Sequence, residues 1–393
     1  MTFNEVVDRR NTRSVKWDLT EQLFKDKEIL PMWVADMDFQ TPKPVVDALV
    51  DRASHGIFGY TVTDEAIHSI IKGWLSKKHN WEINTDWLSY SPGVVPSLHT
   101  SVEALTEPGD SILIQTPVYP PFYDVIKKHD RNIVTSSLQL QDGRYEIDFE
   151  DFEEKIQNVK AFILCNPHNP VGRVWTEDEL QRMADLCVKH DVLIFSDEIH
   201  ADLVYAGHKH IPIASLSDEV AHRTTTYFSP TKTFNIAGLQ ASYIVTPDED
   251  MKKKIDAQFG LQGLNMLNTM GVTAIEASYE HGEEWLNELV EVLDANKDQL
   301  MKRVHEETNQ IQIIEPEGTY LVWMDCRGLG LSHNELKEFM RTKAKVGLND
   351  GASFGKEGEG FMRINIATPP PTLNEGIDRI VQAVKNQNET DSN

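Results

Sequence analysis

The sequence of 393 residues predicts an α/β protein with a mostly parallel sheet, accompanied by a second, smaller α+β domain. Short apolar, β-rich runs alternate with helical patterns from about residue 105 to 250. A long helical stretch then leads into a mixed pattern of short strands and helices. Continuous apolar strands that alternate with helices are typical of a parallel sheet covered on both faces. At roughly 150 residues per domain, the length indicates two or three domains with a large core.

Five apolar runs in the first region predict strands: Ser111–Gln115, Ala161–Leu164, Val192–Phe195, Thr224–Phe228 and Ser242–Val245. The clearest intervening helix begins at Thr176, because Thr176 and Glu179 form a T-x-x-E capping box. Apolar residues at helical spacing follow it. Another helical run covers Leu98–Leu105.

Residues 249–308 predict an almost unbroken helix, polar outside with spaced apolar residues. After it we expect strands at Ile311–Ile314, Tyr320–Met324 and Phe361–Ile366, and helices near 333–345 and 372–386. The first 45 residues are irregular and rich in Trp, Pro and Asp. The residue pattern leaves open which domain they pack against.

The charge balance is strongly acidic, with 38 basic against 62 acidic residues and a net charge of −24. Such a surface repels nucleic-acid phosphate and anionic lipid, so we expect neither nucleic acid nor a membrane as a partner. No run approaches the ~20 apolar residues of a membrane span, and the N-terminus lacks an apolar signal core. Three cysteines, Cys165, Cys187 and Cys326, form no disulfide or zinc pattern. A cytoplasmic location is therefore expected.

Chemically versatile side chains follow four of the predicted strands. Tyr119, Asn166, Asp197 and Lys232 each come just after one apolar run. Ligands of parallel α/β sheets bind outside the carboxyl ends of the strands. Each residue alone also fits a structural role, as a packed turn, a turn starter, a helix cap or a solvated lysine. Their common position at one edge predicts a ligand site.

This combination suits pyridoxal 5′-phosphate. That cofactor needs a lysine amine to form an imine with its aldehyde and a carboxylate to keep its ring nitrogen protonated. It also needs an aromatic face, a donor to its ring hydroxyl, and backbone N–H groups for its phosphate at a helix start. Gly93, ahead of a helical run, permits close approach of the backbone to that phosphate, although an ordinary loop-to-helix turn would look the same.

The sequence resembles the fold-type I pyridoxal-phosphate enzymes, the aspartate aminotransferase superfamily, through the runs Ser91–Leu98, Cys165–Gly172, Ser196–Leu203 and Ser229–Gly238. Within this superfamily it looks most like the cystathionine β-lyase or C–S lyase branch, through Trp33–Phe39, the Gly59-Tyr60 pair, the Asp-Glu-Ile-His run at 197–200 and Thr116–Phe122. The similarity extends from about Arg10 to Val384.

The resemblance implies a large domain with a mostly parallel sheet of seven strands and a smaller α+β domain. It divides the chain into an N-terminal segment that packs with the small domain (1–47), the large cofactor-binding domain (48–285), the C-terminal small domain (286–387) and a disordered tail (388–393).

The resemblance also implies residue roles. Lys232 would bond covalently to the cofactor, Asp197 would pair with the ring nitrogen, Asn166 would donate to the ring hydroxyl, and Tyr119 would stack on the ring. Gly93, Val94, Val95 and Ser229 would bind the phosphate, and His200 would lie beside the cofactor. Tyr60 would reach the phosphate of a neighbouring subunit, which makes the expected unit a homodimer. Arg363 would bind the substrate α-carboxylate through its guanidinium fork, beside Asn166 and Tyr119.

Two departures from the aminotransferase pattern favour a lyase. His200 stands where aminotransferases usually carry a tyrosine, and Gln240 stands where they usually carry a phosphate-binding arginine. The expected activity is α,β-elimination from L-cystathionine or related cysteine S-conjugates, which gives a thiol, pyruvate and ammonia. The sequence leaves open which sulfur amino acid is the substrate. No metal is expected, because His200, His208 and His210 match no ligand spacing.

Other functions remain as alternatives. An aminotransferase on the same fold would need a 2-oxo acid acceptor. A regulatory role through protein contacts would come in addition to catalysis, since Lys232 and Asp197 are both present. Ser229 to Lys232 matches the S-x-x-K of serine enzymes, but the S-D-N and K-T-G motifs are absent. The sequence lacks the G-x-G-x-x-G fingerprint of dinucleotide-binding proteins, so we do not expect dinucleotide binding.

Overall fold

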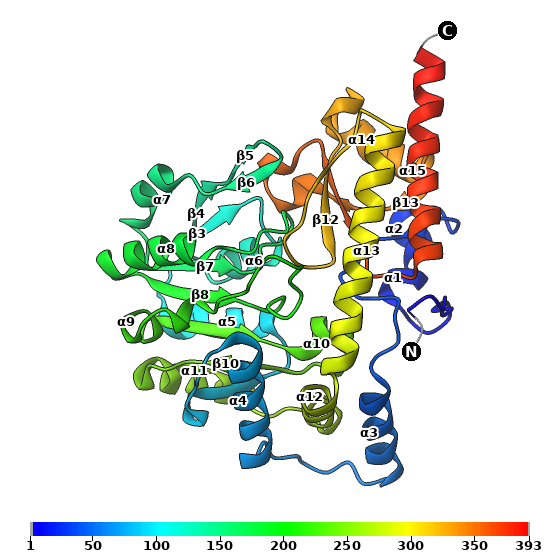
Figure 1. The fold of residues 1–393 in the computed structure, drawn as a ribbon. Coiled ribbons are helices and arrows are strands. Elements are labelled where there is room, and N and C mark those ends of the chain that lie inside the picture. Colours follow the sequence, from blue (N-terminus) through cyan, green and yellow to red (C-terminus); the bar gives the residue numbers. More distant parts are fainter. Residues whose placement is uncertain (1–2, 392–393) are drawn as a thin grey trace.

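A seven-stranded sheet forms the centre of the larger part of the molecule in the computed structural model, which describes residues 3–391 (Figure 1). The strand order is β2-β10-β9-β8-β7-β3-β4. Only β10 runs antiparallel to its neighbours, and the other four pairings are parallel. The predicted α/β class with a mostly parallel sheet is confirmed. The strands are β2 (Leu88–Ser91), β3 (Ser111–Thr116), β4 (Asn132–Ser137), β7 (Ala161–Cys165), β8 (Leu193–Asp197), β9 (Thr224–Phe228) and β10 (Ser242–Val245).

Both faces of this sheet are buried, because successive side chains of a strand point to opposite sides. Leu113, Phe162 and Leu164 pack with helices α7 (Phe149–Ile156) and α8 (Glu177–Lys189). Their strand neighbours Ile112 and Ile163 pack on the other face with α5 (Val94–Leu105), α6 (Pro121–Lys128) and α11 (Glu249–Gln262). The continuous apolar runs of the sequence follow from this burial on both faces.

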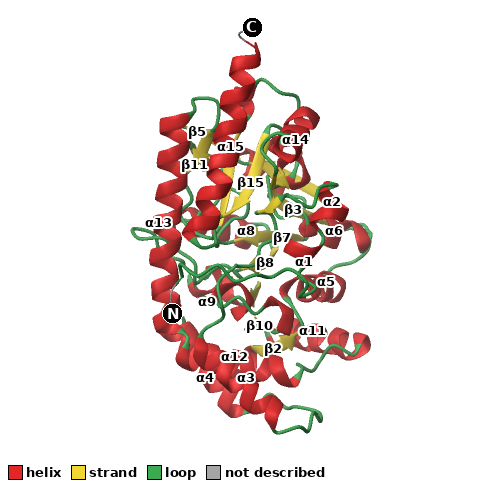
Figure 2. Cartoon of the chain, turned by 90° about the vertical axis from the view of Figure 1, so that its right-hand side faces the viewer, coloured by secondary structure: helices red, strands yellow, loops and turns green. Residues whose placement is uncertain are grey.

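The smaller part holds a four-stranded antiparallel sheet of order β11-β12-β15-β14. Its strands are β11 (Gln312–Ile314), β12 (Leu321–Asp325), β14 (Asn349–Asp350) and β15 (Phe361–Asn365). The long helices α13 (Glu283–Glu307) and α15 (Pro370–Asp391) pack side by side along it (Figure 2). Helix α14 (His333–Thr342) completes this α+β layer.

The remaining elements are short or lie at the edges. The helices are α1 (Val15–Asp18), α2 (Thr20–Phe24), α3 (Lys43–Ser54), α4 (Glu65–His79), α9 (Asp218–Ala221), α10 (Pro230–Thr233) and α12 (Thr269–His281). The 3₁₀ turns are Thr85–Trp87, Ile213–Ser215, Ala237–Leu239, Arg327–Leu329, Gly351–Phe354 and Lys356–Gly358. Strands β1 (Leu30–Pro31) with β13 (Val346–Gly347), and β5 (Gln139–Gln141) with β6 (Arg144–Glu146), form two small ribbons. No helix among residues 3–391 combines the length and apolarity of a membrane span.

The prediction of one almost unbroken helix over residues 249–308 is wrong. Three helices, α11, α12 and α13, occupy the region. Gly263 ends α11 in the left-handed conformation at φ 68°, which glycine adopts without the Cβ clash of other residues. A turn follows before Asn268 caps α12.

Other differences arise where local signals are weak. Strands β2 and β4 were not predicted, because Leu88–Ser91 and Asn132–Ser137 are mostly polar. Helix α5 begins at Val94 rather than Leu98. The capping box at Thr176 is confirmed. Helix α15 continues to Asp391, so most of the tail expected to be disordered, 388–393, is helical, and residues 392–393 lie outside the described residues.

The N-terminal segment contacts both parts of the molecule. Strand β1 pairs with β13 of the smaller part, and the Asp38 amide donates to the Ala367 carbonyl. On the other side, the Met37 amide donates to the side-chain oxygen of Asn235. The positions of the domain boundaries stay a prediction.

Glu317 joins the two parts through a buried ionic network. Its carboxylate accepts hydrogen bonds from Arg144 at 2.8 Å, from Arg173 at 2.9 Å and from the Val174 amide at 2.8 Å. Burial alone would raise the pKa of Glu317, but Arg173 and the other donors hold it below its ordinary value. The adjoining Gly172 has φ 76°, and a Cβ there would lie 2.7 Å from Pro316. This junction fixes the start of β12 against the loop that follows β7.

We predict that Glu317→Gln destabilises the protein by about 2–3 kcal/mol at neutral pH, because it removes the charged acceptor of the buried Arg173, the Val174 amide and the partly exposed Arg144, and leaves Arg173 with Glu179 as its one carboxylate among the described residues. The folded-state pKa of Glu317 is depressed, so its contribution is present above the unfolded value of about 4.3 and is lost as pH falls through the folded value. Urea titrations of both proteins from pH 7 to pH 3 measure this difference.

The control is Glu153→Gln, which removes an exposed carboxylate paired with Lys189. We expect that variant to unfold at the parental urea concentration. Equal midpoints for Glu317→Gln and the parent at pH 7 would contradict the junction's role.

Candidate active site

The carboxyl ends of four strands bring the predicted residues to one edge of the large sheet. Tyr119 follows β3, Asn166 follows β7, and Asp197 is the last residue of β8. Lys232 lies in α10, which begins directly after Ser229 at the end of β9. The Asn166 amide donates to the Asp197 carbonyl at 2.9 Å, which ties two of these ends together.

Lys232 is partly buried, and its amine donates a hydrogen bond of 2.6 Å to the carbonyl of Ala35. Burial, together with the nearby Arg363 cation, lowers the pKa of Lys232 to about 8. The carboxylates of Asp36 and Asp197 oppose that shift. A substantial fraction of this amine is therefore neutral near pH 7–8, which is the form that attacks an aldehyde or accepts a proton.

Asp197 is a buried carboxylate with little support from the chain. Its side chain accepts from the Ile199 amide at 3.2 Å. Burial raises the pKa of Asp197 to about 7, against that hydrogen bond and the Lys232 cation. Such a carboxylate gains most from a cationic N–H donor, and a protonated pyridine nitrogen is one.

Tyr119 and His200 lie beside the Lys232 amine and the Asp197 carboxylate. Tyr119 lies close enough to Asp197 and Arg363 for both to influence it, and burial raises the pKa of its phenol. Burial and the Lys232 and Arg363 cations lower the pKa of His200 to about 3, so this imidazole is neutral. Its ring packs edge-on against Tyr320, with centroids 5.9 Å apart.

The structure places Asn166 at the same edge, completely buried, with its amide nitrogen donating to the Ile211 carbonyl at 3.2 Å. Its side-chain oxygen has no partner within the described chain. An unpartnered buried polar atom of this kind indicates a ligand at the site.

Arg363 is a buried cation that faces neutral acceptors. It lies on β15, is 4% exposed, and donates to Asn169 at 3.0 Å, Asn349 at 2.6 Å and the Trp33 carbonyl at 3.0 Å. Its Nε has no partner within residues 3–391. Burial lowers the pKa of Arg363 to about 10. A guanidinium held in this way is suited to a carboxylate ligand.

The expected phosphate cradle lies at the start of α5. The first-turn amides of Val94 and Val95 have no acceptor within the helix, and they carry the positive end of its dipole. A Cβ on Gly93 would lie in van der Waals contact with the Pro96 ring, at 3.4 Å, and without that Cβ a ligand can approach the backbone at this turn. Ser91 pairs with Ser242 across the sheet, and Ser229 donates to the adjacent Ala241 carbonyl at 2.6 Å. Ser229 therefore lies beside this helix start, where it also caps α10.

Tyr60 lies outside this cluster. It belongs to the loop between α3 and α4, which projects from the lower edge of the molecule, and its side chain is 99% exposed (Figure 1). Gln240 is also exposed, at the left-handed end of a 3₁₀ turn.

Sequence reasoning missed four groups that the fold brings into the site: the Ala35 carbonyl, Asn169, Tyr320 and Asn349. Asn169 stands in the same Asn-Pro-His-Asn-Pro run as Asn166, so its motif was the available signal. Ala35 stands in the run Trp33–Phe39 that carried the resemblance to the lyase branch, whereas Tyr320 and Asn349 contact the site only through tertiary packing, which local sequence does not show.

These residues fit pyridoxal phosphate. The unpartnered oxygen of Asn166, the Asp197 carboxylate with its single amide donor and the uncapped first-turn amides of α5 match a polar ring with a phosphate. No group of three or more histidine, cysteine or acidic side chains in the described chain could hold a metal ion.

Known proteins that are similar to this chain include lyases and structures that contain pyridoxal phosphate. The chain is 45% identical to the cystathionine β-lyase PatB of Bacillus subtilis, over 98% of this chain and 100% of that protein. Cystalysin of Treponema denticola, a structure that contains pyridoxal 5′-phosphate, superposes with a TM-score of 0.96 at 36% identity, covering 98% and 99% of the two chains. The PLP-bound C–S lyase of Staphylococcus hominis gives a TM-score of 0.91 at 34% identity, covering 98% of both chains.

The family model for aminotransferase class I and II matches residues 27–380. This match confirms the superfamily resemblance, and the relatives confirm the similarity to C–S lyases. The chain belongs to the aminotransferase class I and II family.

Proposed function

We propose that the protein is a pyridoxal-phosphate-dependent C–S β-lyase that acts on L-cystathionine or a related cysteine S-conjugate. The observation that carries this proposal is the cluster of Lys232, Asp197 and Arg363 at one edge of the sheet. A base, a partner for a ring nitrogen and a carboxylate anchor are what amino-acid chemistry with this cofactor requires. Similarity to the lyases named above supports elimination as the outcome.

The residues have distinct tasks in this reaction. When bound, pyridoxal phosphate supplies an electron-withdrawing ring that acidifies the α-carbon of an amino acid. Arg363 holds the substrate carboxylate, with Asn169 and Asn349 fixing the guanidinium. The Lys232 amine accepts the α-proton, since its lowered pKa leaves a substantial fraction of it neutral near pH 8. The bond between the β-carbon and sulfur then breaks, the thiolate leaves, and water completes the conversion to pyruvate and ammonia.

Asp197 and the neutral side chains support that chemistry. The Asp197 carboxylate would hold a proton on the ring nitrogen of the bound cofactor, and Tyr119 would cover its ring face. His200 is neutral, so it adds no charge beside the Lys232 amine. The Val94 and Val95 amides with Ser229 would hold the phosphate, and the dipole of α5 would replace part of the cation that Gln240 does not supply.

We also propose a cytoplasmic homodimer in which Tyr60 reaches the partner's site. Exposed apolar side chains gather on α3 and the loop that follows it: Val46, Val50, Ile57, Phe58, Tyr60 and Val62. An apolar surface of this kind usually marks an interface. The three cysteines are free and buried, as suits a reducing compartment.

The first prediction from this proposed function concerns the reaction itself. Purified protein supplied with L-cystathionine and no 2-oxo acid releases pyruvate and a free thiol over many turnovers. Lys232→Ala loses both this release and the visible absorption of the lysine–cofactor bond, because it removes the amine that would form this bond and accept the α-proton. Coupled pyruvate detection and thiol titration measure the two products.

Amino transfer that appears only when a 2-oxo acid is added would contradict this proposal and favour the aminotransferase alternative. Full activity of Lys232→Ala would overturn the site assignment as a whole.

The second prediction tests the carboxylate anchor. Arg363→Lys raises KM for cystathionine by about 100-fold and lowers kcat less, because an ammonium cannot reproduce the two-point contact of a guanidinium. Steady-state kinetics measure both constants. The matched control is Arg327→Lys, an arginine of the same part of the chain that lies over an aromatic ring but pairs with Asp325 outside the site. Equal KM values in the two variants would contradict the role of Arg363 in binding the substrate carboxylate.

The third prediction tests the dimer. Phe58→Glu places a charge in the apolar patch and shifts the protein to monomers, which sedimentation velocity detects. Leu23→Glu, at an exposed apolar residue on α2, serves as the control and leaves the oligomer intact. A Phe58→Glu protein that sediments like the parent would place the interface elsewhere.

A further inference from the structure

The carbonyl oxygen of Ala35 accepts two hydrogen bonds inside the site. Lys232 donates to it at 2.6 Å and the Tyr320 hydroxyl donates at 2.9 Å. Tyr320 is fully buried and precedes β12, which the Glu317 junction holds in place. Two donors thus share one acceptor, and one of them is the amine that performs the proposed chemistry.

The segment that carries this carbonyl, Trp33–Asp38, is fixed along its whole length. Five successive carbonyls, from Trp33 to Met37, each accept a hydrogen bond from a side chain. The donors are Arg363, Asn365, Lys232 with Tyr320, Asn365 again, and Arg9 with Asn235. A segment bound in this way cannot swing its carbonyls toward a new donor.

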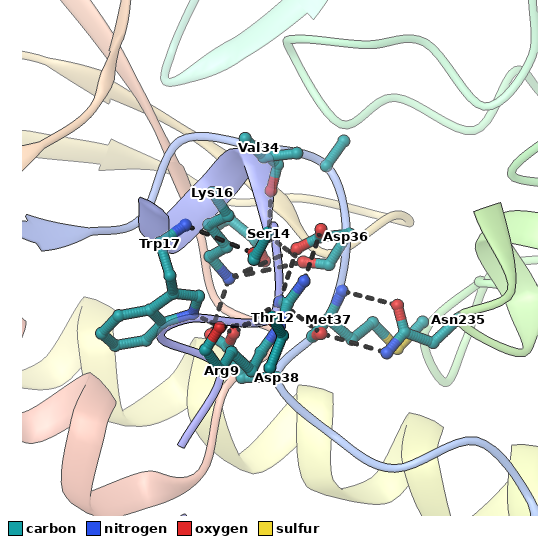
Figure 3. A network of polar contacts seen from close by, with 12 residues as sticks. Arg9, Thr12, Ser14, Lys16, Trp17, Val34, Asp36, Met37, Asp38 and Asn235 are labelled. Atoms are coloured by element: carbon teal, nitrogen blue, oxygen red, sulfur yellow. Dashed lines mark hydrogen bonds and ion pairs between the residues drawn. The ribbon is translucent and has the colours of Figure 1, made fainter. Parts of the chain in front are cut away.

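A buried ionic network secures the far side of the segment (Figure 3). Asp38 accepts from Lys16 at 2.6 Å, from Trp17 at 2.8 Å and from Arg9 at 2.8 Å, and Lys16 is 1% exposed. Burial alone would raise the pKa of Asp38, but these donors hold it below its ordinary value. Arg9 also binds both carboxylate oxygens of Asp36. The N-terminal residues thereby set the position of the Ala35 carbonyl.

We propose that Tyr320 is a positioning residue that keeps the Lys232 amine ready to accept a proton, by competing with it for the fixed carbonyl oxygen of Ala35. Because the Ala35 carbonyl cannot move, the hydrogen bond from Tyr320 weakens the hydrogen bond that the same oxygen accepts from the Lys232 ammonium. A hydrogen bond from a charged donor stabilises the protonated form, and sharing the acceptor reduces that stabilisation. This inference rests on the proposed function only for its link to turnover.

The charged and titratable groups around Lys232 come from four elements, and Tyr320→Phe leaves all of these residues in place: Asp36 on the fixed segment, Asp197 on β8, His200 in the turn after it, and Arg363 on β15. Their combined effect, with burial, already sets the pKa of Lys232 to about 8. Loss of the Tyr320 hydroxyl leaves the Ala35 oxygen to Lys232 alone.

The experiment compares Tyr320→Phe with Tyr205→Phe. Tyr205 is a matched control, because its buried hydroxyl donates to the Thr319 carbonyl at 2.7 Å, one residue from Tyr320 and away from Lys232. The full-length chain, freed of cofactor, is mixed with pyridoxal phosphate, and the rate at which the lysine–cofactor absorption appears is followed from pH 6 to pH 10. Only the neutral amine reacts, so the midpoint of this profile reports the proton affinity of Lys232.

We expect the midpoint to rise by about 0.5–1 pH unit in Tyr320→Phe and to stay at the parental value in Tyr205→Phe. In the holoenzyme, kcat for pyruvate release at pH 7 falls about three- to tenfold in Tyr320→Phe and recovers at higher pH, while KM is unchanged. Recovery at high pH separates this role from a loss of structure.

An unchanged midpoint in Tyr320→Phe, or a capture rate that is low at every pH, would overturn the inference. The capture profile needs no turnover. If the protein binds the cofactor but releases no pyruvate, the proposed function fails while the comparison of midpoints still decides the role of Tyr320.

Discussion

Three ionisable side chains lie in the interior at one place without full counter-ions, and the rest of the structure is arranged around them. Lys232 donates to a carbonyl, Arg363 donates to two amides and a carbonyl, and Asp197 accepts from a single amide. Burying charges in this way is costly unless a ligand completes them. A zwitterionic amino acid beside a cofactor with a ring nitrogen and a phosphate would complete all three.

Other buried acidic side chains of the described residues have more hydrogen-bond partners than Asp197 has. His79 pairs with Asp202 at 2.9 Å and His210 with Glu198 at 2.8 Å, both close to the ends of the same strands. Glu317 and Asp38 each collect three donors. These networks hold β12 and segment Trp33–Asp38 rigidly. That rigidity keeps Lys232, Asp197 and Arg363 in their positions although they lack full counter-ions.

Sequence reasoning found what local patterns determine. The apolar strands β3, β7, β8, β9 and β10 were identified, because burial on both faces makes them continuous in sequence. Lys232, Asp197, Asn166 and Tyr119 followed, since each comes just after a strand. The polar strands β2 and β4 and the break at Gly263 escaped, because pairing partners and a single backbone angle decide them. Tyr320 and Ala35 meet Lys232 across 285 and 197 residues, and no local signal records that contact.

The net charge of −24 bears on which reaction this site serves. A strongly acidic surface repels anions at long range and has little effect on molecules without net charge. Cystathionine and cysteine S-conjugates with neutral substituents are zwitterions with no net charge, so they approach freely. A 2-oxo acid acceptor is an anion, and it would have to reach Arg363 against the field of the whole protein. The field of the surface thus slows the approach of an oxo acid more than that of a neutral sulfur amino acid, while the cations inside the site act at short range on either ligand.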